Sequence, residues 1–329
     1  MTAAAAPSAG ERPGSAWSRW LVRPEAPALV FLIALLVFLS VTAPGFLTAA
    51  NLSSILTSVA VLGIIALGVN QVVLAGEIDI SVGSALGLCA VASGAAAKTG
   101  GLGLALVVAI AIGTLVGGLN GFLVTRGRVP SIIVTLGMLY ALRGLVLIVT
   151  GGDWVTGLPH GSRVLGLSTL AGVNVSIFVL AAVAIAVALI ARSTTWGRDV
   201  YAVGGNRRAA VYAGISLRRT RWLAFTLTGA LVGLASVIFF SRVGIVPTNA
   251  GSGLELQVLA AVVIGGTSIS GGRGSPFAAV VGAVLIGVFL NGLVLLNVPG
   301  LWQNVVVGGL ILLAVATDTL RRRLVGDQT

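Results

Sequence analysis

Residues 75–84 read Ala-Gly-Glu-Ile-Asp-Ile-Ser-Val-Gly-Ser and interrupt two long apolar blocks of the chain. Only residues 76–78 lie between these blocks, which is too short for an ordinary loop, so we expect an irregular connection. Its two carboxylates, Glu77 and Asp79, must reach water, a partner or a helix end, because a charge in lipid is costly. Asp79 is placed to cap the next helix by accepting a hydrogen bond from the N–H near Ser81. The stretch therefore predicts a helix break, which caps the next helix, lines a polar path, or does both.

The composition around this break is that of a membrane protein. Hydrophobic residues make up 57% of the 329 residues and charged residues only 9%, whereas a soluble domain carries about 25% charged residues. A soluble globule of this size cannot bury so much apolar surface, and a disordered chain has low hydrophobicity and high charge. The apolar residues form long blocks instead of alternating with polar ones, which disfavours an outer-membrane barrel. The sequence thus predicts an all-α polytopic membrane protein.

Ten apolar blocks approach the length of about 20 residues that a membrane-spanning helix needs. They occupy residues 28–43, 55–75, 79–97, 102–125, 131–150, 172–191, 222–241, 255–270, 276–296 and 302–320. The pair Asn120-Gly121 and Val129-Pro130 recurs as Asn291-Gly292 and Val298-Pro299, in a stretch that crosses in the opposite direction. We therefore expect about ten transmembrane helices and an inverted repeat, which is common in transporters.

The basic residues predict the orientation of these spans. If the N-terminus is inside, 16 arginines fall in inside segments and three basic residues fall outside, as the positive-inside rule requires. We expect both termini to be cytoplasmic and one transmembrane domain to cover residues 28–320, between cytoplasmic tails at 1–27 and 321–329. The net charge of +11 is spread over short clusters between apolar blocks. It therefore indicates membrane loops and contact with lipid, and no nucleic acid.

Glycines recur at a four-residue spacing, which lets membrane helices approach closely. The instances are Gly113-Gly117-Gly121, Gly229-Gly233 and Gly83-Gly87. Because 46 glycines produce many such pairs by chance, we expect close helix packing from the triple alone.

Motifs for catalysis and metal binding are missing from the sequence. The only lysine, Lys98, is preceded by alanine, so the chain has no Walker A loop to hold ATP phosphates. The lone Cys89 is expected to be a buried hydrophobe and the lone His160 a solvated loop residue, since neither builds a metal site alone. We therefore expect no catalytic residue, metal or cofactor in this chain, with any ATP bound by a partner subunit.

Polar side chains within or at the ends of the apolar blocks mark a candidate path for a solute. They are Asp79, Ser81, Ser84, Asn120 and Asn291. An unsatisfied polar group in lipid costs roughly several kcal/mol, so these groups are expected to face a polar path. Arg143 and Glu255 also fall within blocks, without an obvious partner by spacing. Proton-coupled transporters place acidic or histidine relays in their spans, and we find no such paired relay.

The longest cytoplasmic loop, residues 192–221, contains a short predicted helix. Asn206 is a suitable N-cap and Gly214 a suitable C′ residue for it. A two-turn helix is unstable alone in water, so it must pack on something. The loop either touches anionic lipid through its arginines or docks a cytoplasmic partner.

Several long motifs in order resemble the membrane permease subunits of bacterial ABC importers for monosaccharides, the ribose/xylose/galactose type. The resemblance runs from about Phe46 to Asp318. Its motifs are Glu77-Ile78-Asp79-Ile80-Ser81-Val82-Gly83-Ser84, Val129-Pro130-Ser131, Thr135-Leu136-Gly137, Arg143-Gly144, Thr150-Gly151-Gly152, Gly197-Arg198, Ala202-Val203-Gly204-Gly205-Asn206, Ala213-Gly214-Ile215, Leu254-Glu255, Ala260-Ala261-Val262-Val263-Ile264-Gly265-Gly266-Thr267-Ser268 and Gly271-Gly272-Arg273-Gly274-Ser275. Glu77 departs from the family, in which many members carry glycine there.

The resemblance implies a division of labour in the bacterial inner membrane. Two permeases, as a homodimer or with a paralogue, would form the path, two ATPase subunits would dock on the cytoplasmic side, and a periplasmic or lipid-anchored sugar-binding protein would deliver the substrate. The docking segment would comprise Gly205, Asn206, Arg207, Arg208, Ala209, Ala210 and Gly214. Residues 154–159 and 245–255 look closest to permeases for autoinducer-type furanosyl signals or rhamnose. An ion-coupled secondary transporter of small polar solutes is the alternative, whereas a lipid-modifying enzyme would need a polar catalytic cluster that the sequence lacks.

Overall fold

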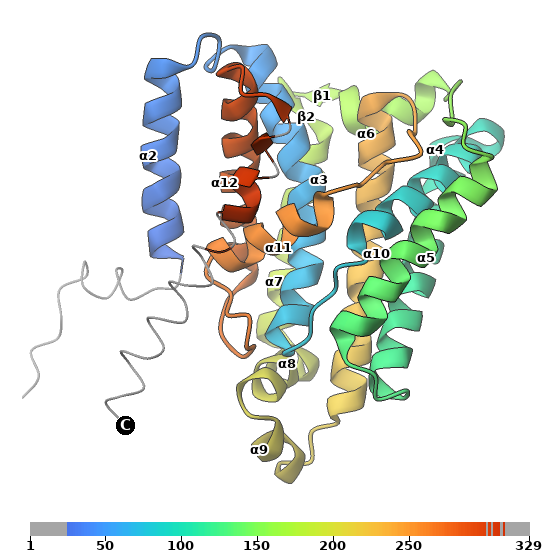
Figure 1. The fold of residues 1–329 in the computed structure, drawn as a ribbon, viewed down its shortest axis with the longest axis vertical. Coiled ribbons are helices and arrows are strands. Elements are labelled where there is room, and N and C mark those ends of the chain that lie inside the picture. The colour runs from blue at the N-terminus through green and yellow to red at the C-terminus, as the bar shows by residue number, and fades with distance from the viewer. Residues whose placement is uncertain (1–24, 301, 304, 310–311, 313–329) are drawn as a thin grey trace, which may run out of the picture.

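The computed structural model describes residues 25–300, 302–303, 305–309 and 312. Helices make up most of this part of the chain (Figure 1). They are α2 (Ala26–Thr42), α3 (Ala49–Leu74), α4 (Val82–Thr125), α5 (Ser131–Thr150), the 3-10 helix η1 (His160–Arg163), α6 (Val164–Leu167), α7 (Val175–Ser193), α8 (Thr195–Gly205), α9 (Arg207–Tyr212), α10 (Leu217–Val243), α11 (Leu254–Ile264) and α12 (Pro276–Leu295).

Six of these described helices are long and apolar enough to cross a membrane: α3, α4, α5, α7, α10 and α12. The apolar helices α2 and α11 are shorter. The predicted block 255–270 corresponds to the 11-residue helix α11, which ends at Ile264, before the Gly265-Gly266 turn. The block 302–320 and both predicted tails lie largely outside the described residues. The count of ten spans and the cytoplasmic termini therefore stay predictions.

Two predicted blocks, 79–97 and 102–125, form the single 44-residue run of α4. Gly101 interrupts it with φ 63° and ψ −160°, a conformation that glycine adopts readily. Ala97 and Ala105 belong to the same buried cluster as Phe240 of α10, so the chain reverses at this glycine. The two halves of α4 are thus two separate helices, as their hydropathy predicts.

The second half of α4 packs against α10 through glycines. A β-carbon at Gly113 or Gly117 would overlap the backbone of Gly229 or Phe225, and one at Gly229 would overlap Gly113. The predicted packing of the glycine triple is confirmed, and its partner includes the pair Gly229 and Gly233, from which the sequence alone predicted no close contact. The helices α3 and α10 are largely buried in the centre, whereas α5 and α7 expose most of their apolar surface.

A small hairpin departs from the predicted all-α fold. Strand β1 (Thr169–Leu170) pairs antiparallel with β2 (Val173–Asn174), and the isolated bridge Val155–Val246 ties two loops together. Each strand has only two residues, so the apolar periodicity of the sequence carries no signal for them. At the opposite end of the molecule, α8 and α9 lie together below the long helices (Figure 1).

Candidate functional site

The break between α3 and α4 is held open by buried polar groups. Asp79 accepts hydrogen bonds from the backbone N–H and the hydroxyl of Ser81, at 2.9 and 2.7 Å. Asn120, from the returning half of α4, donates to the Ser81 hydroxyl at 2.8 Å. The predicted bond between Asp79 and Ser81 is confirmed, although α4 begins only at Val82, one residue after Ser81. The chain is thus non-helical from Ala75 to Ser81 because side chains replace the missing helical bonds.

This cluster retains hydrogen-bonding capacity that no described residue uses. Ser84 lies one turn into α4 and is 2% exposed, and Asn120 is 1% exposed. The Ser84 hydroxyl and the Asn120 carbonyl oxygen have no partner among the described residues. Buried polar atoms are almost always satisfied in native proteins, so unpaired ones beside a helix break are candidates for contact with water or a hydroxylated ligand.

Asn291 lies apart from this cluster. It is on α12 and exchanges two hydrogen bonds with Asn51 in the first turn of α3, at 3.1 and 2.7 Å. Asp79, by contrast, follows the other end of α3. The structure therefore brings together four of the five predicted path residues, Asp79, Ser81, Ser84 and Asn120, and separates Asn291 from them.

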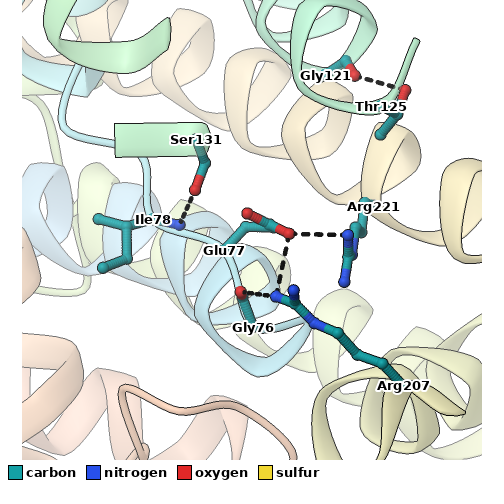
Figure 2. A network of polar contacts seen from close by, with 8 residues as sticks. All are labelled: Gly76, Glu77, Ile78, Gly121, Thr125, Ser131, Arg207 and Arg221. Atoms are coloured by element: carbon teal, nitrogen blue, oxygen red, sulfur yellow. Dashed lines mark hydrogen bonds and ion pairs between the residues drawn. The ribbon is translucent and has the colours of Figure 1, made fainter. Parts of the chain in front are cut away.

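Glu77 joins the break to the α8–α9 end of the molecule (Figure 2). Its Oε1 lies 3.0 Å from Arg221 Nη1 of α10 and 3.3 Å from Arg207 Nη2 of α9. Arg207 also donates to the Gly76 carbonyl at 2.7 Å. The sequence placed Glu77 at the break but gave no sign of these partners, which lie 130 or more positions away.

The predicted short helix in the loop 192–221 is confirmed as α9. Its N-cap Asn206 accepts a bond from Ala209 N–H at 3.0 Å, and Gly214 follows its C-cap with φ 76°. The backbone bond from Ile215 to the Ala210 carbonyl closes the end. Arg208 and Ala209 are exposed on α9, as is Gly205 before it, whereas Ala210 is buried.

Glycines allow α8 to lie directly against the break. A β-carbon at Gly204 would overlap the Leu74 carbonyl, which also accepts a bond from Gly272 N–H at 2.9 Å. Three segments far apart in sequence therefore meet at the end of α3. Spacing alone carried no signal for this meeting point, although Gly204 and Gly272 both lie in motifs of the resemblance.

A second non-helical segment lies against the start of α4. Glu255 accepts a bond from Gly253 N–H at 3.2 Å, and its other oxygen is buried without a partner in the described part of the chain. A β-carbon at Gly83 would overlap this oxygen and the Gly251 carbonyl. The Glu255 carboxylate is thus packed at the first turn of α4, close to the break.

Known proteins resemble this chain over most of its length. The family model described as branched-chain amino acid transport system / permease component matches residues 51–315. Three similar proteins are each named autoinducer 2 import system permease protein LsrC. That of Enterobacter sp. (strain 638) is 41% identical over 293 residues, covering 88% of this chain and 85% of the relative. That of Klebsiella pneumoniae is 41% identical over 292 residues, with the same shares, and that of Yersinia enterocolitica is 38% identical, covering 88% and 81%. No solved structure matches the chain.

Proposed function

The chain belongs to the family described as branched-chain amino acid transport system / permease component and is a multi-pass permease of the inner membrane; we propose that it imports a monosaccharide or a related furanosyl compound. The substrate class follows the relatives, whose names specify autoinducer 2 import, and departs from the amino acid in the family description. Uncharged hydrogen-bonding groups near the break suit a solute rich in hydroxyls.

Energy for this import is proposed to enter through α9. The observation that carries the proposal is the direct link from Arg207, the first residue of α9, to the Gly76 carbonyl and the Glu77 carboxylate at the break. A partner ATPase that moves the exposed face of α9 would therefore move the break between α3 and α4. The partners are two ATPase subunits, a periplasmic or lipid-anchored binding protein and a second permease, identical or paralogous.

The path is proposed to pass along the break. Asp79, Ser81, Ser84 and Asn120 lie there, and the two unpaired oxygens of the cluster support it. Asn291 would lie at the far end of the same path, beside Asn51. ATP would be bound by the partner, since the chain contains no Walker A sequence.

The proposal is tested by reconstitution in liposomes with the partner ATPase and binding protein. Uptake of labelled autoinducer 2, ribose and leucine is measured with internal ATP and no ion gradient. We expect ATP-driven accumulation of autoinducer 2 or a sugar and none of leucine. Uptake by this chain alone, driven by a pH step and abolished by a protonophore, would instead establish the secondary transporter.

A further inference from the structure

A cleft of about 570 Å³ opens beside Glu77 at the α8–α9 end of the molecule. Three parts of the chain line it: the break, the turn between α4 and α5, and the starts of α9 and α10. None of the interactions described above requires a space of this size. It would hold a small organic molecule with several charged groups.

The lining of this cleft is strongly basic. It includes Arg128, Arg207, Arg218 and Arg221, against the single carboxylate of Glu77. Both ion pairs found in the described residues use that one carboxylate, so Arg128 and Arg218 have none. The four arginines and the one glutamate together give the cleft a net charge of +3.

Arg221 has donors to spare. Its Nη1 holds Glu77, while its Nε and Nη2 have no partner within the described chain. These two nitrogens form one edge of the guanidinium, the edge that binds an oxyanion through two parallel hydrogen bonds. This edge of the Arg221 guanidinium is buried. A ligand would therefore reach it only if Glu77 were displaced and the Arg221 side chain turned.

The backbone around the cleft favours negative charge as well. Helix α5 begins at Ser131 without a side-chain cap, and α10 begins at Leu217. Both helix starts line the cleft, and each carries partial positive charge. Arg128 adopts φ 56°, a left-handed conformation that is strained for a non-glycine residue. Backbone strain of this kind clusters at functional sites.

We propose that this cleft binds a phosphate-bearing anion, which competes with Glu77 for Arg221. The phosphate group belongs either to a soluble phosphorylated molecule or to an anionic lipid headgroup. Because Glu77 is attached to the break, a bound anion would release it from α9 and α10. The site thus offers control of the break from the α8–α9 side, through a ligand that also contacts Arg207 of the proposed docking segment.

Binding is measured on the full chain in nanodiscs of neutral phosphatidylcholine, by equilibrium dialysis against labelled inorganic pyrophosphate. We expect saturable binding by the wild type. Arg128→Ala and Arg218→Ala should each weaken it by about tenfold, the loss of one charge-assisted hydrogen bond. Glu77→Gln should strengthen it, because the competing carboxylate is gone. Arg198→Ala, which removes an exposed arginine of α8 outside the cleft, should leave it unchanged.

A second arm identifies the source of the phosphate. In nanodiscs containing phosphatidylglycerol, a lipid headgroup in the cleft should compete with pyrophosphate, and native mass spectrometry should show retained lipid that Arg218→Ala loses. Pyrophosphate affinity that is equal in both lipids would assign the site to soluble anions. Absence of saturable binding together with equal lipid retention in all variants would overturn the proposal. The readout requires neither ATP nor transport, so its outcome is independent of the proposed import function.

Discussion

Gly204 and Gly205 are adjacent residues with opposite surroundings. A β-carbon at Gly204 would overlap the Leu74 carbonyl, whereas one at Gly205 meets nothing within 4 Å. We expect Gly204→Ala to destabilise the fold by about 1–3 kcal/mol, the usual cost of overpacking, and to lower ATP-driven uptake by moving α8 off the break. Gly205→Ala is the matched control for stability, since a β-carbon there meets nothing in this chain. Thermal unfolding in detergent and uptake in liposomes measure the two effects of Gly204→Ala, and equal unfolding temperatures of the two variants would refute the contact.

Asp79 provides a second test at this scale. Asp79→Ala removes the acceptor of two bonds from Ser81 and should cost about 1–3 kcal/mol, because buried donors are left unpaired. Asp79→Asn keeps an oxygen acceptor and should retain most of the stability. The midpoint of thermal unfolding compares them. If Asn is as damaging as Ala, the negative charge itself is required, and the role as a cap is insufficient.

At the scale of the element, Gly117 and Gly118 separate packing from helix propensity. Gly117 faces the backbone of α10, whereas a β-carbon at Gly118 would only touch the Thr226 side chain at 3.8 Å. Gly118→Ala should be neutral or stabilising by about 0.5–1 kcal/mol, since alanine favours helix. Gly117→Ala should be destabilising despite the same gain in propensity. The midpoints of thermal unfolding in detergent compare the two variants. A Gly117→Ala variant more stable than the wild type would contradict the close contact between α4 and α10.

The short helix α9 is tested through its two alanines. Ala209 is exposed, so Ala209→Glu should abolish coupled uptake while leaving membrane insertion and unfolding unchanged. Ala210 is buried, so Ala210→Glu should also lower the unfolding temperature, which makes it the less specific variant. ATP-driven uptake and co-purification of the ATPase are the measurements. Normal uptake by Ala209→Glu would show that α9 does not dock the ATPase.

Different elements were predictable to different degrees, for physical reasons. The block 131–150 matches α5 residue for residue, because Pro130 precedes the helix and Gly151 ends it in a left-handed conformation. The helix break was predictable because carboxylates interrupt apolar runs. The ion pairs of Glu77 with Arg207 and Arg221 were not predictable, because these residues are far apart in the sequence and no helical or strand periodicity connects them. The shortness of α11 was missed because hydropathy continues past the point where Gly265 and Gly266 turn the chain.

The whole molecule should show two chemically distinct ends and a path between them. Single cysteines are introduced into a Cys89→Ala background, so that the introduced cysteine is the only thiol in the chain. Cysteine at Ala209 should react with impermeant thiol reagents from the cytoplasmic side, and cysteine at Asp153 from the opposite side. Cysteines at Asn120 and Asn291 should react in at least one transport state. Inaccessibility of both in every state would restrict them to interhelical hydrogen bonding, and reversed labelling of the ends would invert the predicted orientation.

The reciprocal amide pair between Asn51 and Asn291 has a mechanical consequence. It pins the first turn of α3 to α12, while the other end of α3 adjoins the contacts made by α8 and Arg207. From Asn51 to Leu74 the helix extends about 35 Å at 1.5 Å per residue, so a tilt of about 5° about the pinned end displaces Leu74 by about 3 Å. The helix would then pivot about a pair of asparagines, so that a displacement applied by α9 beside Leu74 is largest at the break and falls to zero at the Asn51 end.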